Sequence, residues 1–483
     1  MKPLTLKEEV PPKWNFQERA VSFMAGKSTG ILRLKVQDSV VESMVAYPGR
    51  AILYADPGLG KTRISIETYV ALCNGEKVIV TCTKRNALNT WRREFLKWTD
   101  IDPEDIIIVR GTSAQRRKQW AKPAQVYITV AKGASTSSDS EMIDAHQFSL
   151  WIYDECQGMR SRKTQMFEHY AKYARRVPYV IFQSGTLISR GPENLWTYLH
   201  CLNHKTFSSY WKWVNTFCTV IDGPWGKEII GPRNLEALHK VLASRMVRIS
   251  ADDPEVSKAR PPLLRTAVEI DMTDEQASIM EQLVNELWLM TPGGELIATP
   301  SRMAMIMKLR QALVCPKILD PSYGYGSAIE DVLEQLDDDP HIVIFTPFKK
   351  AFPFIIEAMV NAGFPEPFQL MGGIDPDELR DVEEGFATDP ARALICTIPF
   401  AESFELPSAR QAFFVGYEWD QLLNEQAEMR LLRLITPHPV TSNYYVYRGS
   451  VDDDIRDVLN RKARLVKQTM KGFMNALEKF RDD

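Results

Sequence analysis

Residues 51–62 read AILYADPGLGKT, an apolar run followed by a glycine-rich turn and then Lys61-Thr62. A helical pattern begins at the lysine. A strand, a glycine-rich loop and a helix in this order form the context in which a G-x-x-x-x-G-K-[ST] loop binds phosphate, because N–H groups of the loop and of the helix start face the phosphate oxygens. Ala55 replaces the first glycine of that pattern, which costs little at negative φ because it adds only a methyl group. The stretch therefore predicts a nucleotide site at the end of a strand.

This loop suggests roles for particular side chains. Lys61 would neutralise the β- and γ-phosphates of ATP, and the Thr62 hydroxyl would ligate Mg²⁺. The partner site should be acidic and should end another strand of the same sheet. The run FSLWIYDE (148–155) provides it, because Asp154 is suited to hold Mg²⁺ through water and Glu155 to orient or deprotonate the attacking water. The expected ATP-binding loop consists of Asp56, Pro57, Gly58, Leu59, Gly60, Lys61 and Thr62.

Short apolar runs alternate with helical patterns along both halves of the 483-residue chain, which predicts mostly parallel sheets with helices on their faces. A segment rich in proline and charge (251–270) separates the two blocks and reads as a linker. We therefore expect an α/β fold of two tandem lobes, one from residues 1–250 and one from residues 271–483 with a basic C-terminal helix. Residues 273–318 read as helical. The expected strands are 51–55, 77–83, 105–111, 125–131, 148–155 and 178–185 in the first half, and 341–348, 368–373, 392–398, 411–417 and 442–448 in the second.

A third part of the predicted site comes from the second block. In WDQLLNEQAEMRLLRL, the side chains of Gln426, Arg430 and Arg433 recur at i, i+4 and i+7 and form one polar stripe. As arginine fingers, Arg430 and Arg433 would stabilise charge on the transferring γ-phosphoryl group. ATP would then lie in a cleft between the lobes, closing it on binding and releasing it on hydrolysis. The alternative is a solvated arginine face that pairs with glutamates of the same helix.

The bulk composition limits the class of protein. Net charge is −3, so a polyanion must be bound by a local patch rather than by a generally basic surface. The seven cysteines are scattered without a C-x-x-C pair, which favours a reducing compartment over disulfides or a zinc ribbon. No apolar run approaches the about 20 residues of a membrane span. We therefore expect a monomeric, cytoplasmic enzyme that makes no membrane contacts.

These motifs, in this order, resemble those of helicase superfamily two, and within it the SWI/SNF-type DNA-dependent ATPases. The resemblance runs over residues 12–465 and implies two RecA-like lobes with ATP bound between them. FQERAVSFM resembles the adenine-reading Q motif, with Gln17 as the reading residue. SGTLISRGPENLW resembles motif III, with Ser184 and Thr186 in the positions that couple hydrolysis to movement. NEQAEMRLLRL resembles motif VI, with Gln426 at the nucleotide.

Members of this family bind duplex DNA across both lobes and move along one strand, usually without separating the strands. The resemblance implies contacts to the phosphate backbone, which suit a motor that accepts any sequence. A chain of this size suits a compact, phage- or bacterial-like member, which in the first case would act in the host cytoplasm. By position, the DNA-binding candidates are Lys84, Arg85, Thr346, Lys349, Gly372, Gly373 and Thr397.

Three positions depart from the family pattern. Gln157 stands where many members carry histidine, so its link to the γ-phosphate would differ. Leu187 replaces a proline that commonly follows the Gly-Thr of motif III. Motif V, read as CTIPFAESFELPSARQAF (396–413), lacks the usual glycines, and Glu405 falls where Asn or Asp is usual. By the family pattern, Glu405 belongs with the residues that couple hydrolysis to movement.

The sequence therefore predicts an ATP- and Mg²⁺-dependent DNA translocase that acts mainly on duplex DNA. It would remodel or reanneal forked or branched DNA, or displace bound proteins, with an unknown protein partner as a further expectation. A strand-separating helicase is one alternative, which would need a wedge or β-hairpin in the second lobe. An ATP-gated DNA-binding protein with little turnover is the other, and it is disfavoured by the presence of Lys61, Glu155, Arg430 and Arg433.

Overall fold

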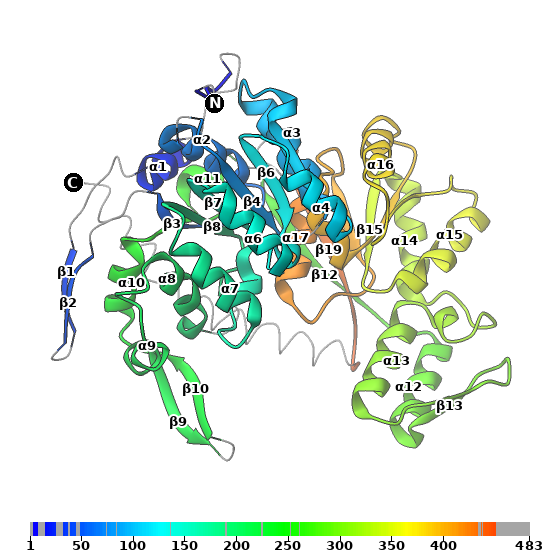
Figure 1. Cartoon of the computed structure of the whole chain (residues 1–483). Coiled ribbons are helices and arrows are strands. Elements are labelled where there is room, and N and C mark those ends of the chain that lie inside the picture. The colour runs from blue at the N-terminus through cyan, green and yellow to red at the C-terminus, as the bar shows by residue number, and fades with distance from the viewer. Residues whose placement is uncertain are drawn as a thin grey trace. The chain divides into compact units, whose positions relative to one another are not determined.

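The computed structural model describes most of the chain, and the described residues form two compact units (Figure 1). One unit contains the described residues up to Val256, and the other contains those from Ser257 onward. This boundary lies inside the segment 251–270 that the sequence suggested as a linker. The described residues are 3–7, 15–25, 32–36, 39–44, 49–73, 75–83, 85–135, 137–188, 191–223, 226–251, 253–259, 261–432, 436 and 438–450.

The first unit is built on a seven-stranded sheet in which all neighbouring strands are parallel, in the order β11-β3-β8-β7-β4-β6-β5. All six strands expected in this half of the sequence are present. The seventh, β11, was not expected, because a four-residue run that contains an arginine carries little strand signal of its own. The strands are β3 (Arg50–Ala55), β4 (Val78–Cys82), β5 (Ile106–Val109), β6 (Val126–Val130), β7 (Leu150–Asp154), β8 (Tyr179–Ser184) and β11 (Met246–Ile249).

Helices cover both faces of this sheet, and Figure 1 shows α2 and α3 on one side and α7 and α8 on the other. On β7, Trp151 points into the core under α7, where its ring lies 4.9 Å from the ring of Tyr170 and 5.2 Å from that of Tyr173. Because both faces are buried, the strands read as continuous apolar runs rather than alternating ones. The packed helices are α1 (Asn15–Met24), α2 (Lys61–Cys73), α3 (Asn86–Trp98), α7 (Gln165–Ala174), α8 (Trp196–Leu202) and α10 (Leu235–Ala243).

The other elements of the first unit lie in its connections. Two antiparallel hairpins, β1-β2 and β9-β10, were not expected from the sequence. Figure 1 shows β9-β10 projecting from its unit beyond α9. These elements are β1 (Leu32–Val36), β2 (Ser39–Met44), α4 (Ser113–Trp120), α5 (Ala131–Ala134), α6 (Ser137–His146), α9 (Tyr210–Phe217), β9 (Cys218–Gly223) and β10 (Gly226–Pro232).

The second unit is built on a six-stranded sheet, again with parallel neighbours, in the order β12-β19-β18-β15-β17-β16. Its strands include the five expected in this half of the sequence. The fold prediction of two α/β lobes with parallel sheets flanked by helices is therefore confirmed. The strands are β12 (Leu263–Ile270), β15 (Ile342–Thr346), β16 (Phe368–Leu370), β17 (Leu394–Thr397), β18 (Gln411–Phe414) and β19 (Val440–Tyr447).

Two separate apolar cores lie on the two faces of this sheet. Alternate residues of β15 divide between them: Ile342 and Ile344 pack with α14 and α15, whereas Val343 and Phe345 pack with α16 and α17. This alternation follows from the two-residue period of a strand. The helices are α14 (Ser327–Asp338), α15 (Phe352–Asn361), α16 (Pro376–Thr388) and α17 (Gln421–Leu431).

Two segments differ from the expectation. The segment 251–270 contains α11 (Pro254–Ala259) and the edge strand β12, which pairs with β19 from Leu263 to Ile270. The sequence suggested a linker because the segment is rich in proline and charge. Many side chains of the edge strand β12 are exposed, so a strand of this kind can carry polar residues as a linker does. Residues 273–318 are not all helical, because Thr291–Glu295 turn the chain in a β-hairpin. The elements are α12 (Asp274–Glu286), β13 (Trp288–Met290), β14 (Leu296–Ala298) and α13 (Arg302–Val314).

All seven cysteines are buried free thiols. Among the described residues, no helix is both long enough and apolar enough to cross a membrane.

Candidate nucleotide site

The glycine-rich loop joins β3 to α2 and contains two residues in the left-handed backbone region. Gly58 and Gly60 both have φ of +79°, a conformation that side chains disfavour. A Cβ at Gly60 would lie 2.4 Å from the Gln17 amide nitrogen, so the loop is also closely packed there. Ala55 is the last residue of β3 and is not among the positive-φ residues, which explains why an alanine replaces the first glycine of the motif.

Lys61 and Gln17 both contact the loop backbone. The Lys61 Nζ donates a hydrogen bond to the Ala55 carbonyl at 3.1 Å and lies 4.0 Å from Glu155 Oε1. The buried Gln17 amide donates to the Leu59 carbonyl at 3.1 Å. The structure thus brings the expected phosphate-binding lysine and the expected adenine-reading glutamine to the same loop.

Asp56, expected in the ATP-binding set, is turned toward β11. Its Oδ1 lies 2.5 Å from an Arg248 guanidinium nitrogen, and its Oδ2 accepts the Ala251 N–H at 2.7 Å. Arg248 also lies over the Tyr54 ring, at 4.3 Å from the ring centroid. The Asp56 side chain therefore anchors the loop to the neighbouring strand.

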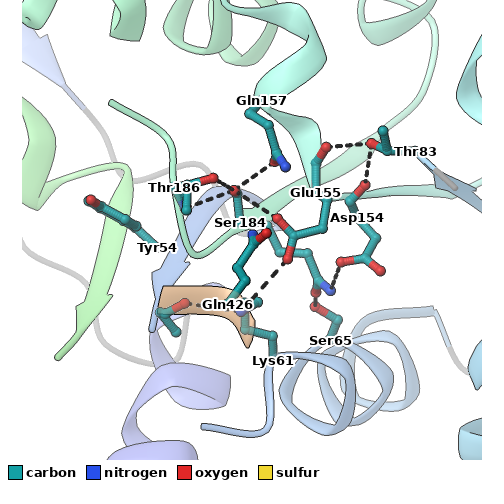
Figure 2. Close-up of polar contacts among 12 residues, drawn as sticks. Tyr54, Lys61, Ser65, Thr83, Asp154, Glu155, Gln157, Ser184, Thr186 and Gln426 are labelled. Atoms are coloured by element: carbon teal, nitrogen blue, oxygen red, sulfur yellow. Dashed lines mark hydrogen bonds and ion pairs between the residues drawn. The ribbon is translucent and has the colours of Figure 1, made fainter. Parts of the chain in front are cut away.

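Asp154 and Glu155 lie at the end of β7, and β8 separates this strand from β3. Because all three strands are parallel, their carboxyl ends meet at one edge of the sheet. Glu155 has φ of +49° and ψ of +57°, a left-handed conformation that costs a non-glycine residue about 1–2 kcal/mol. This conformation turns the chain sharply, and the Thr83 hydroxyl holds the turn by donating to the Glu155 carbonyl at 2.6 Å (Figure 2).

The Asp154 carboxylate is hydrogen-bonded on both oxygens. Gln183 donates to Oδ1 at 2.7 Å, and the indole N–H of Trp91 donates to Oδ2 at 2.8 Å. The Ser65 hydroxyl donates to the Gln183 amide oxygen at 2.5 Å, which fixes the orientation of that amide. Burial raises the pKa of Asp154 above its usual range, the Glu155 charge raises it further, and the Gln183, Trp91 and Lys61 groups act against this increase.

Ser184, one of the residues expected to couple hydrolysis to movement, contacts three other expected site residues. Its hydroxyl lies 3.1 Å from Glu155 Oε2, 2.9 Å from Gln157 Oε1 and 3.4 Å from the Thr186 hydroxyl. Figure 2 shows these four side chains gathered at one place. A hydroxyl has one proton, so Ser184 donates to Glu155 or to Gln157 at any moment. Gln157, which replaces the usual histidine, thus shares a hydrogen-bond donor with Glu155.

The second unit carries the motif VI residues on α17. Gln426 is buried, and the Arg430 guanidinium donates to the Gln426 carbonyl at 3.1 Å and to the Phe404 carbonyl at 3.4 Å. Glu428, fully buried on the same helix, forms a bidentate ion pair with Arg265 of β12, in which Nε donates to Oε1 at 2.9 Å and a terminal guanidinium nitrogen donates to Oε2 at 2.7 Å. Arg433 lies outside the described residues.

Most of the expected DNA-binding residues of the second unit lie at one edge of its sheet. Thr346 and Thr397 are paired neighbours at the ends of β15 and β17, and both are buried. The Thr346 hydroxyl accepts the Phe348 N–H at 3.3 Å. Of the expected DNA-binding residues near this edge, three are exposed: Lys349, Gly372 and Gly373.

Three further expected residues lie elsewhere. Arg85 is exposed at the start of α3 in the first unit, and Lys84 lies outside the described residues. Glu405 of motif V is exposed, and its N–H donates to the Glu383 carboxylate at 2.8 Å.

Several functional neighbours were missed by reasoning from the sequence. Trp91 reads as a core position because it lies on an apolar helix stripe, and Arg248 belongs to an unexpected strand. Arg160 donates to the Thr186 carbonyl, a contact that joins residues in separate motifs. Gln183 directly precedes Ser184 at the end of β8, and this position could have indicated that it belongs to the site.

Sequence comparison identifies relatives of this chain. A profile of the SNF2-related domain matches residues 16–318. The human protein named DNA annealing helicase and endonuclease ZRANB3 is 24% identical over 438 residues, which cover 88% of this chain and 39% of that protein. A Xenopus tropicalis protein, SWI/SNF-related matrix-associated actin-dependent regulator of chromatin subfamily A-like protein 1, is 22% identical over 433 residues, covering 89% of this chain and 44% of that protein. This chain therefore spans less than half the length of these relatives.

Among solved structures, the Pyrococcus furiosus Hef helicase domain has the same fold, with a TM-score of 0.53 at 12% identity, covering 92% of this chain and 97% of that domain. The profile match covers more than half of the chain and includes the loop at Lys61, the acidic pair at Glu155 and the Ser184 region. The resemblance read from the motifs is thus confirmed, and the chain belongs to the SNF2-related domain family.

Proposed function

We propose that the chain hydrolyses ATP and uses the hydrolysis to move along DNA, mainly duplex DNA. One observation supports the hydrolase: Lys61, at the start of α2, lies 4.0 Å from the Glu155 carboxylate after β7, and the Ser184 hydroxyl at the end of β8 lies 3.1 Å from the same carboxylate. Lys61 supplies a cation for the phosphates, and Glu155 supplies a carboxylate for the attacking water. The Ser184 hydroxyl is hydrogen-bonded to that carboxylate. The name of the human relative, an annealing helicase, supports DNA as the partner.

The oxygen donors of Thr62 and Asp154 fit Mg²⁺, which prefers hard oxygen ligands and keeps several waters. When bound, the ion would supply positive charge that neutralises the charge developing on the phosphates. Glu155 would orient the attacking water and accept its proton, while Gln17 and the loop 56–62 would hold the nucleotide. Gln157 would compete with Glu155 for the Ser184 hydroxyl and thereby decide whether that hydroxyl holds the Glu155 carboxylate.

In this proposal the unit before Val256 is the ATP-binding lobe and the unit after it is the second motor lobe. Gln426, Arg430 and Arg433 would act on the nucleotide from the second lobe, with Ser184, Thr186 and Glu405 in coupling roles. The DNA backbone would be contacted through Lys84 and Arg85 in the first lobe. In the second lobe the contacts would be Thr346, Lys349, Gly372, Gly373 and Thr397.

The first test measures ATP hydrolysis with no DNA and with duplex, single-stranded or forked DNA. We expect low hydrolysis alone, strong stimulation by duplex or forked DNA, and loss of hydrolysis in Glu155→Gln with ATP binding retained. Glu168→Gln, an exposed glutamate on α7, is the matched control and should behave as the wild type. A chain that hydrolyses ATP equally with and without every DNA would contradict the motor.

Translocation is tested by displacement of a third strand from triplex DNA. Displacement that needs ATP, without unwinding of a forked duplex, supports movement along intact duplex. Hydrolysis without displacement would instead support the ATP-gated DNA-binding alternative.

Strand separation stays a second candidate because the structure contains a feature that the sequence did not reveal. The hairpin β13-β14 exposes Trp288, Met290 and Leu296, at 39%, 48% and 57% of their surfaces, whereas Leu289 and Ile297 are buried. An exposed aromatic ring can stack on an unpaired base, an interaction worth about 1–3 kcal/mol. If the hairpin separates strands, Trp288→Ala should lose fork unwinding while DNA-stimulated hydrolysis persists.

A further inference from the structure

The metal-holding carboxylate of the proposed site is bonded to a helix that begins next to the expected DNA contacts. Trp91 of α3 is 1% exposed, and its indole N–H donates to Asp154 Oδ2 at 2.8 Å. Its ring packs against the Phe95 ring, with centroids 6.0 Å apart. Packing alone requires only the apolar ring, so the N–H bond to a carboxylate is an additional feature of this position.

The two oxygens of Asp154 are held by different elements. Oδ2 is bonded to α3 through Trp91, whereas Oδ1 is bonded to β8 through Gln183, whose amide is itself fixed by Ser65 of α2. Gln183 belongs to β8 inside the sheet. Trp91 belongs to α3, a helix that packs on the sheet and begins beside the exposed Arg85. Of these two donors, Trp91 is the one through which an event at the surface can reach Asp154.

The position of Trp91 along α3 makes this link short. Arg85 directly precedes the first residue of the helix and is exposed, and Trp91 lies six residues later. At 1.5 Å rise per residue, this is about 9 Å along the helix axis. A helix is stiff along its axis, so a small shift of its first turn moves the indole by a similar amount. An N–H···O bond of 2.8 Å weakens steeply when its length or angle changes.

We propose that Trp91 is a positioning residue through which DNA bound at the start of α3 adjusts the Asp154 carboxylate and so the Mg²⁺ affinity of the nucleotide site. This inference rests on the proposed function, in which Arg85 contacts DNA and Asp154 holds the ion. Helix α3 would thus be the element of the first unit through which bound DNA affects hydrolysis.

The test compares Trp91→Phe with Trp98→Phe. Phenylalanine keeps an aromatic ring in the core but removes the N–H donor. Trp98 is the matched control because it lies on the same helix and its N–H also donates to a carboxylate, that of Glu94 at 2.6 Å, away from Asp154. A purely structural tryptophan would give the same result at both positions.

The first readout is the Mg²⁺ concentration that half-saturates binding of a fluorescent ATP analogue, measured without hydrolysis. Loss of a hydrogen bond to a ligating carboxylate typically costs about 10–100-fold in metal affinity. We expect Trp91→Phe to raise the Mg²⁺ requirement about 10-fold and Trp98→Phe to leave it unchanged. In the same assay, duplex DNA should lower the Mg²⁺ requirement of the wild type and of Trp98→Phe, but not that of Trp91→Phe.

A second variant separates positioning from transmission. Gln183→Met removes the donor to the other Asp154 oxygen but leaves α3 intact. It should raise the Mg²⁺ requirement as Trp91→Phe does, yet keep the response to DNA. If both variants lose the response, transmission is not specific to α3 and the proposal is wrong.

A second readout is measured on the wild-type chain. The wild-type chain is labelled with 5-fluorotryptophan, and the Trp91 resonance is assigned with Trp91→Phe or, if that variant does not fold, with Trp91→Tyr. Duplex DNA added without nucleotide should shift this resonance. DNA that stimulates wild-type hydrolysis without shifting the resonance would overturn the inference and leave the proposed function intact. A wild type that shows no stimulation by any DNA would overturn the proposed function itself.

Discussion

The ion pair between Asp56 and Arg248 predicts a stability effect at a residue that motif reading assigns to the nucleotide. The two side chains are 23% and 12% exposed, and their charged atoms lie 2.5 Å apart. In Asp56→Ala the guanidinium keeps its place over the Tyr54 ring but loses its carboxylate. Breaking a fully buried ion pair costs about 3–5 kcal/mol. Partial access of water to this pair reduces the expected cost to about 2–3 kcal/mol.

This cost should be visible in thermal unfolding of the first unit. One kcal/mol shifts the melting temperature of a domain of this size by about 2–4 °C, so we expect Asp56→Ala to lower Tm by about 4–12 °C. Asp144→Ala is the matched control, because Asp144 pairs with Arg176 at the surface, where the arginine side chain is 62% exposed. An exposed pair contributes about 0–1 kcal/mol, so the control should change Tm by no more than about 4 °C.

A double-mutant cycle with Arg248→Met distinguishes anchoring from nucleotide contact. If the two side chains act as a pair, Asp56→Ala in the Arg248→Met background should cost little further stability, and the coupling energy should be about 2 kcal/mol. Binding of a fluorescent ATP analogue should weaken in both single variants, because both release the loop. The reasoning is refuted if Asp56→Ala weakens ATP binding at unchanged Tm while Arg248→Met binds ATP normally, since Asp56 would then act on the nucleotide directly.

Three further predictions concern the loop, the core and the hairpin of the second unit. Gly60→Ala should abolish ATP-analogue binding, because it places a Cβ on a left-handed residue, 2.4 Å from the Gln17 amide nitrogen. Gly231→Ala is the control, because a Cβ at Gly231 would meet nothing within 4 Å. Arg50→Met should lower the free energy of unfolding of the first unit by about 3 kcal/mol, measured in urea. The reason is that the Arg50 guanidinium donates to five carbonyls around the ends of α7 and α8. A change below about 1 kcal/mol would contradict this. Hydrogen bonds from Thr291, Ser322 and Gly293 lower the pKa of Asp320 to about 2, so its contribution to the hairpin is present above the unfolded pKa of about 4 and is lost as pH falls toward 2. Amide protection in the hairpin, measured relative to the intrinsic exchange rate at each pH, should therefore fall over that range in the wild type, and Asp320→Asn should lack this fall.

The strands of the two sheets were predictable because each can be recognised from its own run of apolar residues. A parallel strand covered on both faces must be apolar throughout, so runs such as 148–155 stand out without knowledge of their neighbours. The hairpins and β11 were not predictable in the same way. The β9-β10 strands leave Ile221 and Ile230 exposed, and β11 has four residues that become a strand only by pairing with β3. Their signal depends on contacts between distant segments.

The same distinction applies to the nucleotide site. Lys61 and Glu155 were predicted because each follows its strand at a spacing that the phosphate chemistry requires. Trp91 and Arg248 act on Asp154 and Asp56 across 63 and 192 residues of sequence. Their side-chain types suit core packing or a surface charge equally well. Only the fold shows that each is bonded to a carboxylate of the site.

The irregular motif V can be understood from the bonds that hold it. Within the segment, the Leu406 N–H donates to the Arg430 carbonyl at 2.8 Å, and the Arg430 guanidinium donates to the Phe404 carbonyl at 3.4 Å. These two hydrogen bonds between the segment and the motif VI helix use backbone groups of the segment, which any residue can supply. The missing glycines alter the surface of motif V but leave its attachment to Arg430 in place. A change in the sequence of this motif is therefore compatible with the hydrolytic role proposed for Arg430.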